Sequence, residues 1–296
     1  MRGVDGRTRV LGLFGYPVEH SLSPRIHNAA FRHLGVNAVY VPFSVRPQDL
    51  KDAVAGVRAL GLTGVNLTIP HKVAALSLVD EVASRARAVG AINTVMNTDG
   101  LLIGDNTDLD GVTVALAEAG TTFEGKTVII AGAGGAARAS ALAAAFGAAR
   151  QIVVLNRTPG RASELAMALG DCATLVGHLS DLPLWLRAAD ILINATPVGL
   201  HESDPSLTDL DGLRPGAVVC DLAYRPGGTA LISRARELGH VTVDGLTILV
   251  HQGARAFTLW TGLDAPVDVM RRAVEAAGCC AADWRVNGIA TLPYSR

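Results

Sequence analysis

The chain lacks an excess of charge of either sign. Its net charge is −1, so no broad basic surface would attract nucleic acid or an anionic membrane. It also lacks a long apolar run, because Arg138 interrupts the alanine-rich segment that follows Gly135. Residues 1–9 are polar and contain no apolar core of a signal peptide. We therefore expect a cytoplasmic protein that binds neither nucleic acid nor membrane.

Cysteines are few and poorly spaced for a metal site. Cys172 and Cys220 are isolated in apolar stretches, and Cys279 and Cys280 are adjacent without a ligand pattern. We expect reduced thiols, no disulfide framework and no metal. The 296 residues, 49% of them hydrophobic and 18% charged, have the composition of a globular protein and suffice for two domains.

Strand and helix patterns alternate along the whole chain, which predicts the α/β class. In the first part the expected strands are 10–14, 38–42, 65–69, 92–96 and 101–104, and the expected helices are 24–33, 48–60 and 73–79. The Asp99-Gly100 pair predicts a hairpin between the last two strands.

From residue 127 onward, buried strands and helices repeat regularly. The expected strands are 127–131, 151–155, 191–194, 218–221 and 241–243, and the expected helices are 135–146, 161–169 and 231–238. Apolar strands separated by helices predict a parallel sheet covered on both faces. We therefore predict one domain at 1–110, completed by 248–296, and a second at 111–247. The helical pattern at 248–276 would cross back to the first domain.

A glycine-rich loop follows the strand at 127–131. Gly132, Gly134 and Ala137 fit the pattern G-x-G-x-x-A between a strand and a helix, which is the context that a dinucleotide-binding loop requires. Gly132 would allow the tight turn, and Gly134 would let backbone N–H groups approach a pyrophosphate. The alternative is a glycine-rich turn in an unrelated α/β domain.

The next strand favours NADP as the cofactor. It ends in Asn156, Arg157 and Thr158, with Arg161 close behind, and lacks the carboxylate that would bind the 2′-hydroxyl of NAD. Arginine can instead hold a 2′-phosphate. The alternative is that both arginines are ordinary surface charges. Thr196, in the loop after the strand at 191–194, would contact the cofactor or serve only as a turn residue.

A lysine and an aspartate form the predicted catalytic pair. Lys72 follows the strand that ends before Pro70, and Asn66 and Thr68 share one face of this strand. When hydride reduces a ketone, an ammonium group beside its oxygen stabilises the developing alkoxide and donates a proton. Asp108 would orient the substrate beside Lys72. The alternative is a purely structural Lys–Asp ion pair.

Two serines precede a predicted helix. Ser21 and Ser23 lie at its start, just before Pro24. A helix N-terminus attracts a carboxylate through its free N–H groups and its dipole, and the hydroxyl groups would add two donors. The alternative, that Ser23 is only the N-cap residue, is compatible with this role.

Nine short motifs occur along the chain in a characteristic order: HSLSP, NLTIPHK, GAINTV, GDNTDLDG, AGAGGAARA, NRT, NATPVG, DLAY and HQGARAF. In this respect the chain resembles the shikimate dehydrogenases. The resemblance implies an N-terminal α/β substrate domain, a Rossmann-like NADP-binding domain and a C-terminal helix that returns to the first domain. It also implies reduction of 3-dehydroshikimate to shikimate with NADPH, in aromatic amino-acid biosynthesis.

The resemblance assigns roles to individual positions, with Lys72 and Asp108 as the catalytic pair. The implied substrate-binding residues are Ser21, Ser23, Asn66, Thr68, Asn93, Tyr224 and Gln252. The implied cofactor-binding residues are Gly132, Ala133, Gly134, Gly135, Ala136, Asn156, Arg157, Thr158, Arg161, Thr196, Leu222 and Gly245. Leu222 and Ile248 stand where the family often has methionine, which leaves the stacking on the nicotinamide open.

The sequence is compatible with two other hypotheses about the function. One is a quinate/shikimate dehydrogenase with a broader choice of substrate or cofactor, although such relatives often carry an acidic residue where Asn156 and Arg157 stand. The other is a non-catalytic NADP sensor, although both Lys72 and Asp108 are present. Family members occur as monomers and as dimers, so the sequence does not decide between a monomer and a homodimer.

Overall fold

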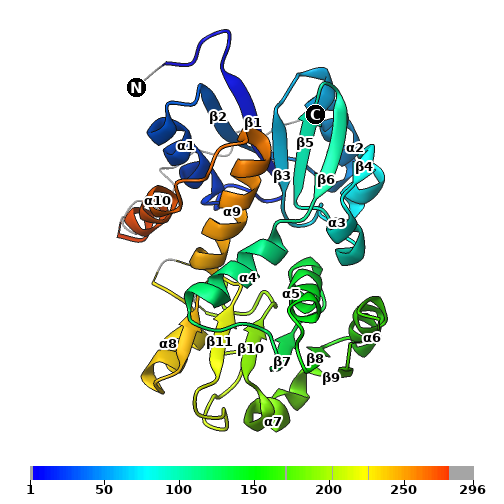
Figure 1. The fold of residues 1–296 in the computed structure, drawn as a ribbon, viewed down its shortest axis with the longest axis vertical. Coiled ribbons are helices and arrows are strands. Elements are labelled where there is room, and N and C mark those ends of the chain that lie inside the picture. Colours follow the sequence, from blue (N-terminus) through cyan, green and yellow to red (C-terminus); the bar gives the residue numbers. More distant parts are fainter. Residues whose placement is uncertain (1–2, 171, 202, 226, 280–296) are drawn as a thin grey trace, which may run out of the picture.

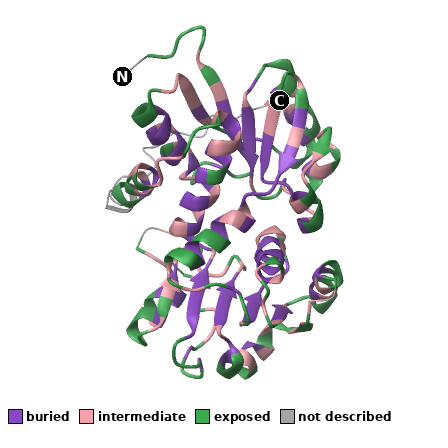
Figure 2. Ribbon diagram, in the orientation of Figure 1, coloured by how far each residue is buried: buried purple, intermediate pink, exposed green. Residues whose placement is uncertain are grey.

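The computed structural model describes residues 3–279 except 171, 202 and 226. Two six-stranded sheets lie one above the other in Figure 1, each flanked by helices. The strands in the middle of each sheet are buried along most of their length, the edge strands are more exposed, and the helices expose their outer faces (Figure 2). Cys280 and the rest of the predicted C-terminal segment lie outside the described residues.

The first sheet is mixed and has the strand order β2-β1-β3-β5-β6-β4. Its strands are β1 (Arg9–Gly15), β2 (Ala38–Ser44), β3 (Gly64–Leu67), β4 (Glu81–Val82), β5 (Thr94–Thr98) and β6 (Leu101–Asp105). Its helices are α1 (Ser23–Leu34), α2 (Leu50–Ala59) and α3 (Ser84–Val89), with short 3₁₀ helices at Pro47–Asp49 and Ala74–Ser77. The predicted hairpin is confirmed: β5 and β6 are antiparallel, and both turn residues have positive φ, 52° at Asp99 and 91° at Gly100.

The second sheet is parallel throughout and has the order β12-β11-β10-β7-β8-β9. Its strands are β7 (Thr127–Ala131), β8 (Gln151–Asn156), β9 (Thr174–His178), β10 (Ile191–Asn194), β11 (Val218–Asp221) and β12 (Val241–Val243). Its helices are α5 (Gly135–Phe146), α6 (Pro159–Ala168), α7 (Leu182–Trp185) and α8 (Ala230–Glu237), with 3₁₀ turns at Leu179–Asp181 and Leu186–Ala188. This order is that of the doubly wound dinucleotide-binding fold, and it confirms the predicted Rossmann-like sheet.

Helices α4 (Asp108–Glu118) and α9 (Gly245–Thr261) connect the two halves, and the last helix, α10 (Val267–Cys279), packs against α1 and α9. Figure 1 shows α4 and α9 in the region between the sheets. A Cβ atom on Gly111 would lie 3.0 Å from the Ile248 carbonyl oxygen, so glycine allows α4 to approach α9 closely. Farther along α9, Phe257 and Trp260 enter the core that contains Leu11 of β1. The chain therefore returns to the first sheet after it has built the second.

Several predicted elements of the first half differ in the structure. Strand β3 ends at Leu67 rather than at residue 69, because the chain turns there and the His71 N–H donates to the Thr68 carbonyl. Only a 3₁₀ turn, Ala74–Ser77, occupies the predicted helix at 73–79. Ser23 is not the N-cap of α1: Leu22 has that position, and the Ser21 hydroxyl oxygen accepts from the Ser23 N–H.

Elements that the sequence analysis did not predict are β4, α3, α4, β9 and α7. Strand β4 has only two residues and α3 only six, too short for a periodic pattern to show. Strand β9 pairs with β8 alone and is largely exposed, so it lacks the apolar run of its neighbours.

A substitution at Gly64, in β3, tests how α9 packs on the first sheet. The Trp260 Nε1–H group donates to the Val95 carbonyl at 3.0 Å. A Cβ atom on Gly64 would lie 2.2 Å from that nitrogen and 2.4 Å from the Val95 oxygen. Gly64→Ala should therefore lower the free energy of unfolding by about 1–3 kcal/mol, as overpacking does, measured by chemical denaturation.

Gly56→Ala provides the matched control. A Cβ atom at Gly56, in the middle of α2, would have no neighbour within 4 Å. Alanine there should leave stability unchanged or raise it by up to about 1 kcal/mol through helix propensity. Equal stability of the two variants would contradict the close approach of Trp260 to β3.

Candidate active site

Two contacts bring the strand ends of the two sheets together. Lys72 follows β3, and its Cδ atom lies 3.8 Å from the position that a Cβ atom on Gly135, the first residue of α5, would take. Tyr224 follows β11; burial raises the pKa of its hydroxyl, while hydrogen bonding to the Leu22 backbone and the Ser21 side chain opposes this rise. A site between the sheets therefore has walls from both halves, at the strand ends where α/β proteins bind ligands.

Lys72 and Asp108 form an ion pair in this region. The Lys72 Nζ donates to Asp108 Oδ2 at 2.6 Å, and the side chains are 21% and 14% exposed. The Asn93 Nδ2 donates to the other carboxylate oxygen of Asp108 at 2.7 Å. The carboxylate is thus held from two sides, while the ammonium keeps access to the space between the sheets.

Asn93 is the centre of a buried network. Its Oδ1 accepts from the Thr107 N–H at 2.8 Å and from the Thr94 hydroxyl at 2.9 Å. Its Nδ2 also lies 3.5 Å from Gln252 Oε1 on α9. The network joins β5, the turn before α4 and α9, so the position of Asp108 depends on all three elements.

Asn66 and Tyr40 form the layer beneath this network. The Tyr40 hydroxyl donates to Asn66 Oδ1 at 2.7 Å, and the Asn66 Nδ2 donates to the Asn93 carbonyl and to the Thr94 hydroxyl, both at 3.0 Å. Burial raises the pKa of Tyr40, so its hydroxyl retains the proton that it donates. Thr68, the first residue after β3, is partly buried.

His27 closes the buried side of this layer. Its ring stacks on Tyr40 with 4.4 Å between the ring centroids. Burial lowers the pKa of His27 to about 3, so the imidazole is neutral at ordinary pH. Neither ring nitrogen has a hydrogen-bond partner among the described residues. The histidine therefore acts here as an aromatic packing residue.

The loop after β7 has the geometry that a dinucleotide requires. Gly132 has φ +115°, and a Cβ atom there would lie 2.7 Å from the Ala195 carbonyl oxygen, so only glycine fits. Gly134 is the N-cap of α5, and the backbone of Gly135 and Ala136 begins the helix. The free N–H groups of this first turn and the helix dipole favour a pyrophosphate.

The predicted adenosine-side residues lie together at the end of β8. The Asn156 Nδ2 donates to the Thr158 carbonyl at 3.0 Å, and Thr158 is the N-cap of α6. Arg157 and Arg161 are exposed. Within the part of the chain that the structure describes, neither guanidinium has an ion-pair or hydrogen-bond partner, so both are available for a phosphate.

A buried polar network fixes the loop after β10. The Thr196 N–H and hydroxyl both donate to Asn194 Oδ1, at 3.0 and 2.7 Å. The Asn194 Nδ2 donates to Asp221 Oδ1 at 2.8 Å, and the Thr229 hydroxyl donates to Asp221 Oδ2 at 2.7 Å. Thr196 is thereby held at the end of the sheet, next to the loop that follows β11.

Gly245 lets α9 begin against that second loop. A Cβ atom on Gly245 would lie 2.6 Å from the Ala223 carbonyl oxygen and 2.8 Å from that of Leu222. Leu222 is only partly buried. All the site residues predicted from the sequence thus lie at or just beyond the ends of strands, or on the helices that follow them. The roles assigned to them stay predictions.

Sequence reasoning missed several residues that hold the site together. They are Tyr40, Thr94, Thr107, Asn194, Asp221 and Thr229. For all of them but Thr229, the available signal was a polar side chain within or directly after a strand, since a buried polar group needs a partner. Thr229 is the N-cap of α8. The pattern could not tell which partner each of them has.

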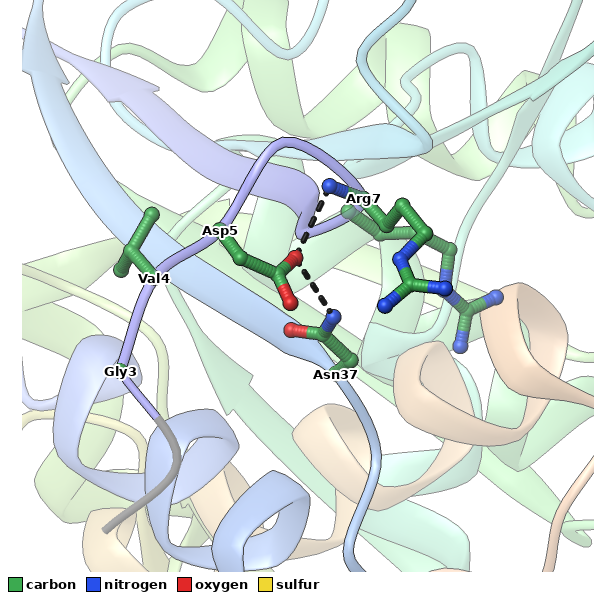
Figure 3. A pocket seen from close by; sticks show the side chains of 6 residues that line it. Gly3, Val4, Asp5, Arg7 and Asn37 are labelled. Atoms are coloured by element: carbon green, nitrogen blue, oxygen red, sulfur yellow. Dashed lines mark hydrogen bonds between the residues drawn. The ribbon is translucent and has the colours of Figure 1, made fainter.

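A surface hollow of about 830 Å³ lies elsewhere, at the amino end of β1. Gly3, Val4, Asp5, Arg7, Arg9 and Asn37 line it, and Figure 3 shows Asp5 bonded to the Arg7 N–H and to the Asn37 side chain. None of the predicted site residues lines this hollow. We therefore place the candidate active site between the sheets and not here.

The described ranges contain neither a membrane-spanning helix nor a cluster of metal-ligating side chains. No helix there is long and apolar enough to cross a membrane. No group of three or more His, Cys, Asp or Glu side chains there could hold a metal ion.

Models of known families match three parts of the chain. The shikimate dehydrogenase substrate-binding domain matches residues 13–95, the shikimate/quinate 5-dehydrogenase model residues 114–201, and the shikimate 5′-dehydrogenase C-terminal domain residues 245–275. The NADP-dependent shikimate dehydrogenase of Methanothermobacter thermautotrophicus is 45% identical over 277 residues, which cover 92% of this chain and 98% of that protein.

Solved structures agree in fold. A crystal structure of a shikimate dehydrogenase in complex with NADP⁺ has a TM-score of 0.87 and 39% identity, and covers 93% of this chain and 97% of that one. The quinate dehydrogenase of Corynebacterium glutamicum, in complex with NAD, has a TM-score of 0.85 and 33% identity, with 91% and 99% covered.

The Asp221 network gives a prediction for stability against pH. Burial raises the pKa of the Asp221 carboxyl from 3.8 to about 6, although hydrogen bonds from Thr229, Ala223 and Asn194 oppose the rise. Between about pH 4 and pH 6 the native state therefore binds more protons here than the unfolded chain. Raising the pH across this window lowers the free energy of unfolding.

Asp221→Asn should remove this dependence. The free energy of unfolding of the wild type should fall between about pH 4 and pH 6 relative to that of the variant, by at most about 3 kcal/mol. Chemical denaturation at a series of pH values measures the difference. The control is Asp264→Asn, at an exposed position between α9 and α10, which should run parallel to the wild type. If the free energy of unfolding of Asp221→Asn changed with pH in parallel with that of the wild type, the raised pKa of Asp221 would be contradicted.

Proposed function

The chain belongs to the shikimate dehydrogenase family, and we propose that Lys72 and Asp108 carry out its reaction, the reversible reduction of 3-dehydroshikimate to shikimate with NADPH. One observation carries this proposal. The Lys72 side chain is paired with Asp108 at 2.6 Å and lies against Gly135 at the dinucleotide loop. A reacting carbon placed beside this ammonium would therefore be close to both substrate and cofactor walls.

The cofactor, when bound, supplies the hydride. The loop at 132–136 and the N-terminus of α5 fit a pyrophosphate, because a Cβ atom at Gly132 would collide with the Ala195 carbonyl and the first N–H groups of α5 are free. The exposed Arg157 and Arg161 would hold the 2′-phosphate, with Asn156 and Thr158 beside them. Thr196, Leu222 and Gly245 would lie along the nicotinamide half.

Lys72 handles the proton. As hydride adds to the carbonyl carbon, the C=O double bond becomes a single bond and negative charge develops on the oxygen. The Lys72 ammonium stabilises this charge and donates its proton to the oxygen, which gives the hydroxyl group. In the oxidation of shikimate, the neutral amine of Lys72 accepts the hydroxyl proton while the hydride leaves.

Asp108 orients both the Lys72 ammonium and the substrate. Its Oδ2 holds Lys72, and its Oδ1 accepts from Asn93. Because one carboxylate oxygen has lone pairs on either side, Asp108 can also accept a bond from a hydroxyl group of the substrate. A substrate bound in this way would present its reacting oxygen to Lys72.

The remaining polar groups would bind the rest of the substrate. Ser21, just before α1 and beside Tyr224, and Ser23, the first residue of α1, would bind the carboxylate. Gln252 and Thr68 would face the ring hydroxyl groups, together with Asn93. Asn66 would act mainly through the layer beneath, since its side chain bonds to Tyr40, Thr94 and the Asn93 backbone.

The same proposal covers the organisation of the chain. Residues 1–110, completed by 248–296, would form the substrate domain, and 111–247 the NADP-binding domain. Closure of one onto the other would exclude water from the reacting atoms. We place the enzyme in the cytoplasm, where such a biosynthetic reaction would take place.

A quinate/shikimate dehydrogenase is the second candidate, because a quinate dehydrogenase with bound NAD shares the fold. The strand end at Asn156 and Arg157 favours NADP over NAD, and the pocket does not itself distinguish quinate from shikimate. A non-catalytic NADP sensor is disfavoured, because Lys72 and Asp108 are not only present but paired.

The deciding experiment measures reduced cofactor formed by the purified protein, with shikimate or quinate and with NADP or NAD. We expect rapid turnover with shikimate and NADP only. In the same assay Lys72→Ala should lower kcat by about 10²–10⁴-fold, the usual scale for loss of an acid–base group, with a much smaller change in substrate affinity.

Each other outcome has a definite meaning. Comparable rates with quinate or NAD would move the chain to the second candidate. Binding of both ligands without turnover would overturn the enzyme assignment. A Lys72→Ala variant with nearly normal kcat would leave the reaction in place and remove Lys72 from it.

Arg157 provides the test of cofactor choice. Arg157→Ala should raise KM for NADP by about tenfold or more, the scale of a lost charge-assisted hydrogen bond, and should hardly change KM for NAD. The matched control is Arg187→Ala, an exposed arginine of the Leu186–Ala188 turn, which should change neither value. Equal losses for the two cofactors would contradict recognition of the 2′-phosphate by Arg157.

A further inference from the structure

Arg85, on α3, spans the two ends of the turn that carries Asp108. Its Nε and Nη2 donate to the two oxygens of Asp105 at 2.7 and 2.6 Å, and its Nη1 donates to Asp110 Oδ2 at 2.7 Å. Asp105 is the last residue of β6, and Asp110 lies in the first turn of α4. We refer to Arg85, Asp105 and Asp110 as the arginine clamp.

The clamp is partly shielded from solvent, and Asp105 is its buried member. The exposed fractions of the side chains are 24% for Arg85, 7% for Asp105 and 29% for Asp110. Bidentate pairing of a planar guanidinium with a carboxylate fixes direction as well as distance. In addition Arg255, on α9, lies 3.9 Å from the other oxygen of Asp110. The clamp thus sets how the end of β6 and the start of α4 lie relative to each other.

A short chain of hydrogen bonds leads from the clamp to Asp108. Asp105 Oδ1, which Arg85 holds, accepts from the Asn106 N–H at 2.7 Å. Asn106 Oδ1 in turn accepts from the Asp108 N–H at 3.0 Å, and its Nδ2 donates to the Ala91 carbonyl at 3.0 Å. Each bond orients the next residue of the turn. The hydrogen bonds of the Arg85 side chain within the described part of the chain go to Asp105 and Asp110 and not to Lys72 or Asp108.

We propose that Arg85 is a positioning residue for the reaction: it holds the turn between β6 and α4 so that the Asp108 carboxylate meets Lys72. This inference rests on the proposed function, because it gives Arg85 a role in the same site. A lysine at this position would supply the charge but could not bond to both oxygens of Asp105 and to Asp110 at once. The geometry of the guanidinium, and not its charge alone, is therefore what the site requires.

The test uses the full-length chain with the substitution Arg85→Ala. Loss of the clamp should let the carboxylate of Asp108 shift, and kcat should fall by about tenfold to a hundredfold, since small misplacements of catalytic groups have effects of this size. KM for shikimate should stay within about threefold of the wild type. Added guanidinium ion should restore part of kcat in Arg85→Ala and none in Lys72→Ala.

Arg87→Ala is the matched control. Arg87 lies on the same short helix and is exposed, and among the described residues its side chain donates only to the Val82 carbonyl, at 3.5 Å. This variant should keep the kcat of the wild type. If Arg85→Ala does not fold, Arg85→Lys takes its place, with a reduced kcat expected. Arg85 variants with the kcat of Arg87→Ala would overturn the proposal, even if their thermal stability were lower.

Hydrogen–deuterium exchange separates this inference from the proposed function. The amides of Asn106 and Asp108 should exchange faster in the Arg85 variant than in the wild type, and at the wild-type rate in Arg87→Ala. A wild-type chain that showed no turnover would overturn the proposed function, and the exchange rates would still decide whether Arg85 holds the turn. Unchanged exchange at both amides would overturn the clamp.

Discussion

The ion pair between Lys72 and Asp108 is the interaction on which the arrangement of the site depends. Lys72 follows β3, and Asp108 begins α4 after β6, so the pair closes only if two separate strand ends lie within bonding distance. A partly buried charge pair has to be held in a good geometry, because the desolvation of both groups offsets much of their attraction. The neighbouring hydrogen bonds, from Asn93 to the carboxylate and through Asn106 to the Asp108 backbone, supply that geometry.

The two halves of the site use the same structural device. On the substrate side the buried amide of Asn93 joins β5, the turn before α4 and α9. On the cofactor side the buried carboxylate of Asp221 joins the loops after β10 and β11 through Asn194 and Thr229. A buried polar group is stable only when its partners are present. Each network therefore fixes a loop at a strand end and holds the proposed ligand-binding groups of that loop in place.

The second half of the fold was accessible from the sequence because its four central strands are parallel and almost fully buried. Strands β7, β8, β10 and β11 are apolar on both faces, so each of them appears as a short hydrophobic run between helices. The first half was less accessible. Its sheet is mixed and includes the two-residue strand β4, and α3 has too few residues for a helical period. The N-terminus of α1 was assigned to the wrong residue: Ser23 has the right side chain for a cap, but Ser21 reaches the Ser23 N–H.

The sequence by itself determined the α/β class, the dinucleotide loop at Gly132, the absence of a carboxylate at the end of β8, and the family to which the motifs belong. These features are local, because each depends on residue types at fixed spacing along a single segment. Only the tertiary structure decided that Lys72 meets both Asp108 and the start of α5, that Tyr40 supports Asn66, and that Arg85 spans Asp105 and Asp110. Those contacts join segments far apart along the chain, and their partners are selected by strand order and helix packing, which no local pattern encodes.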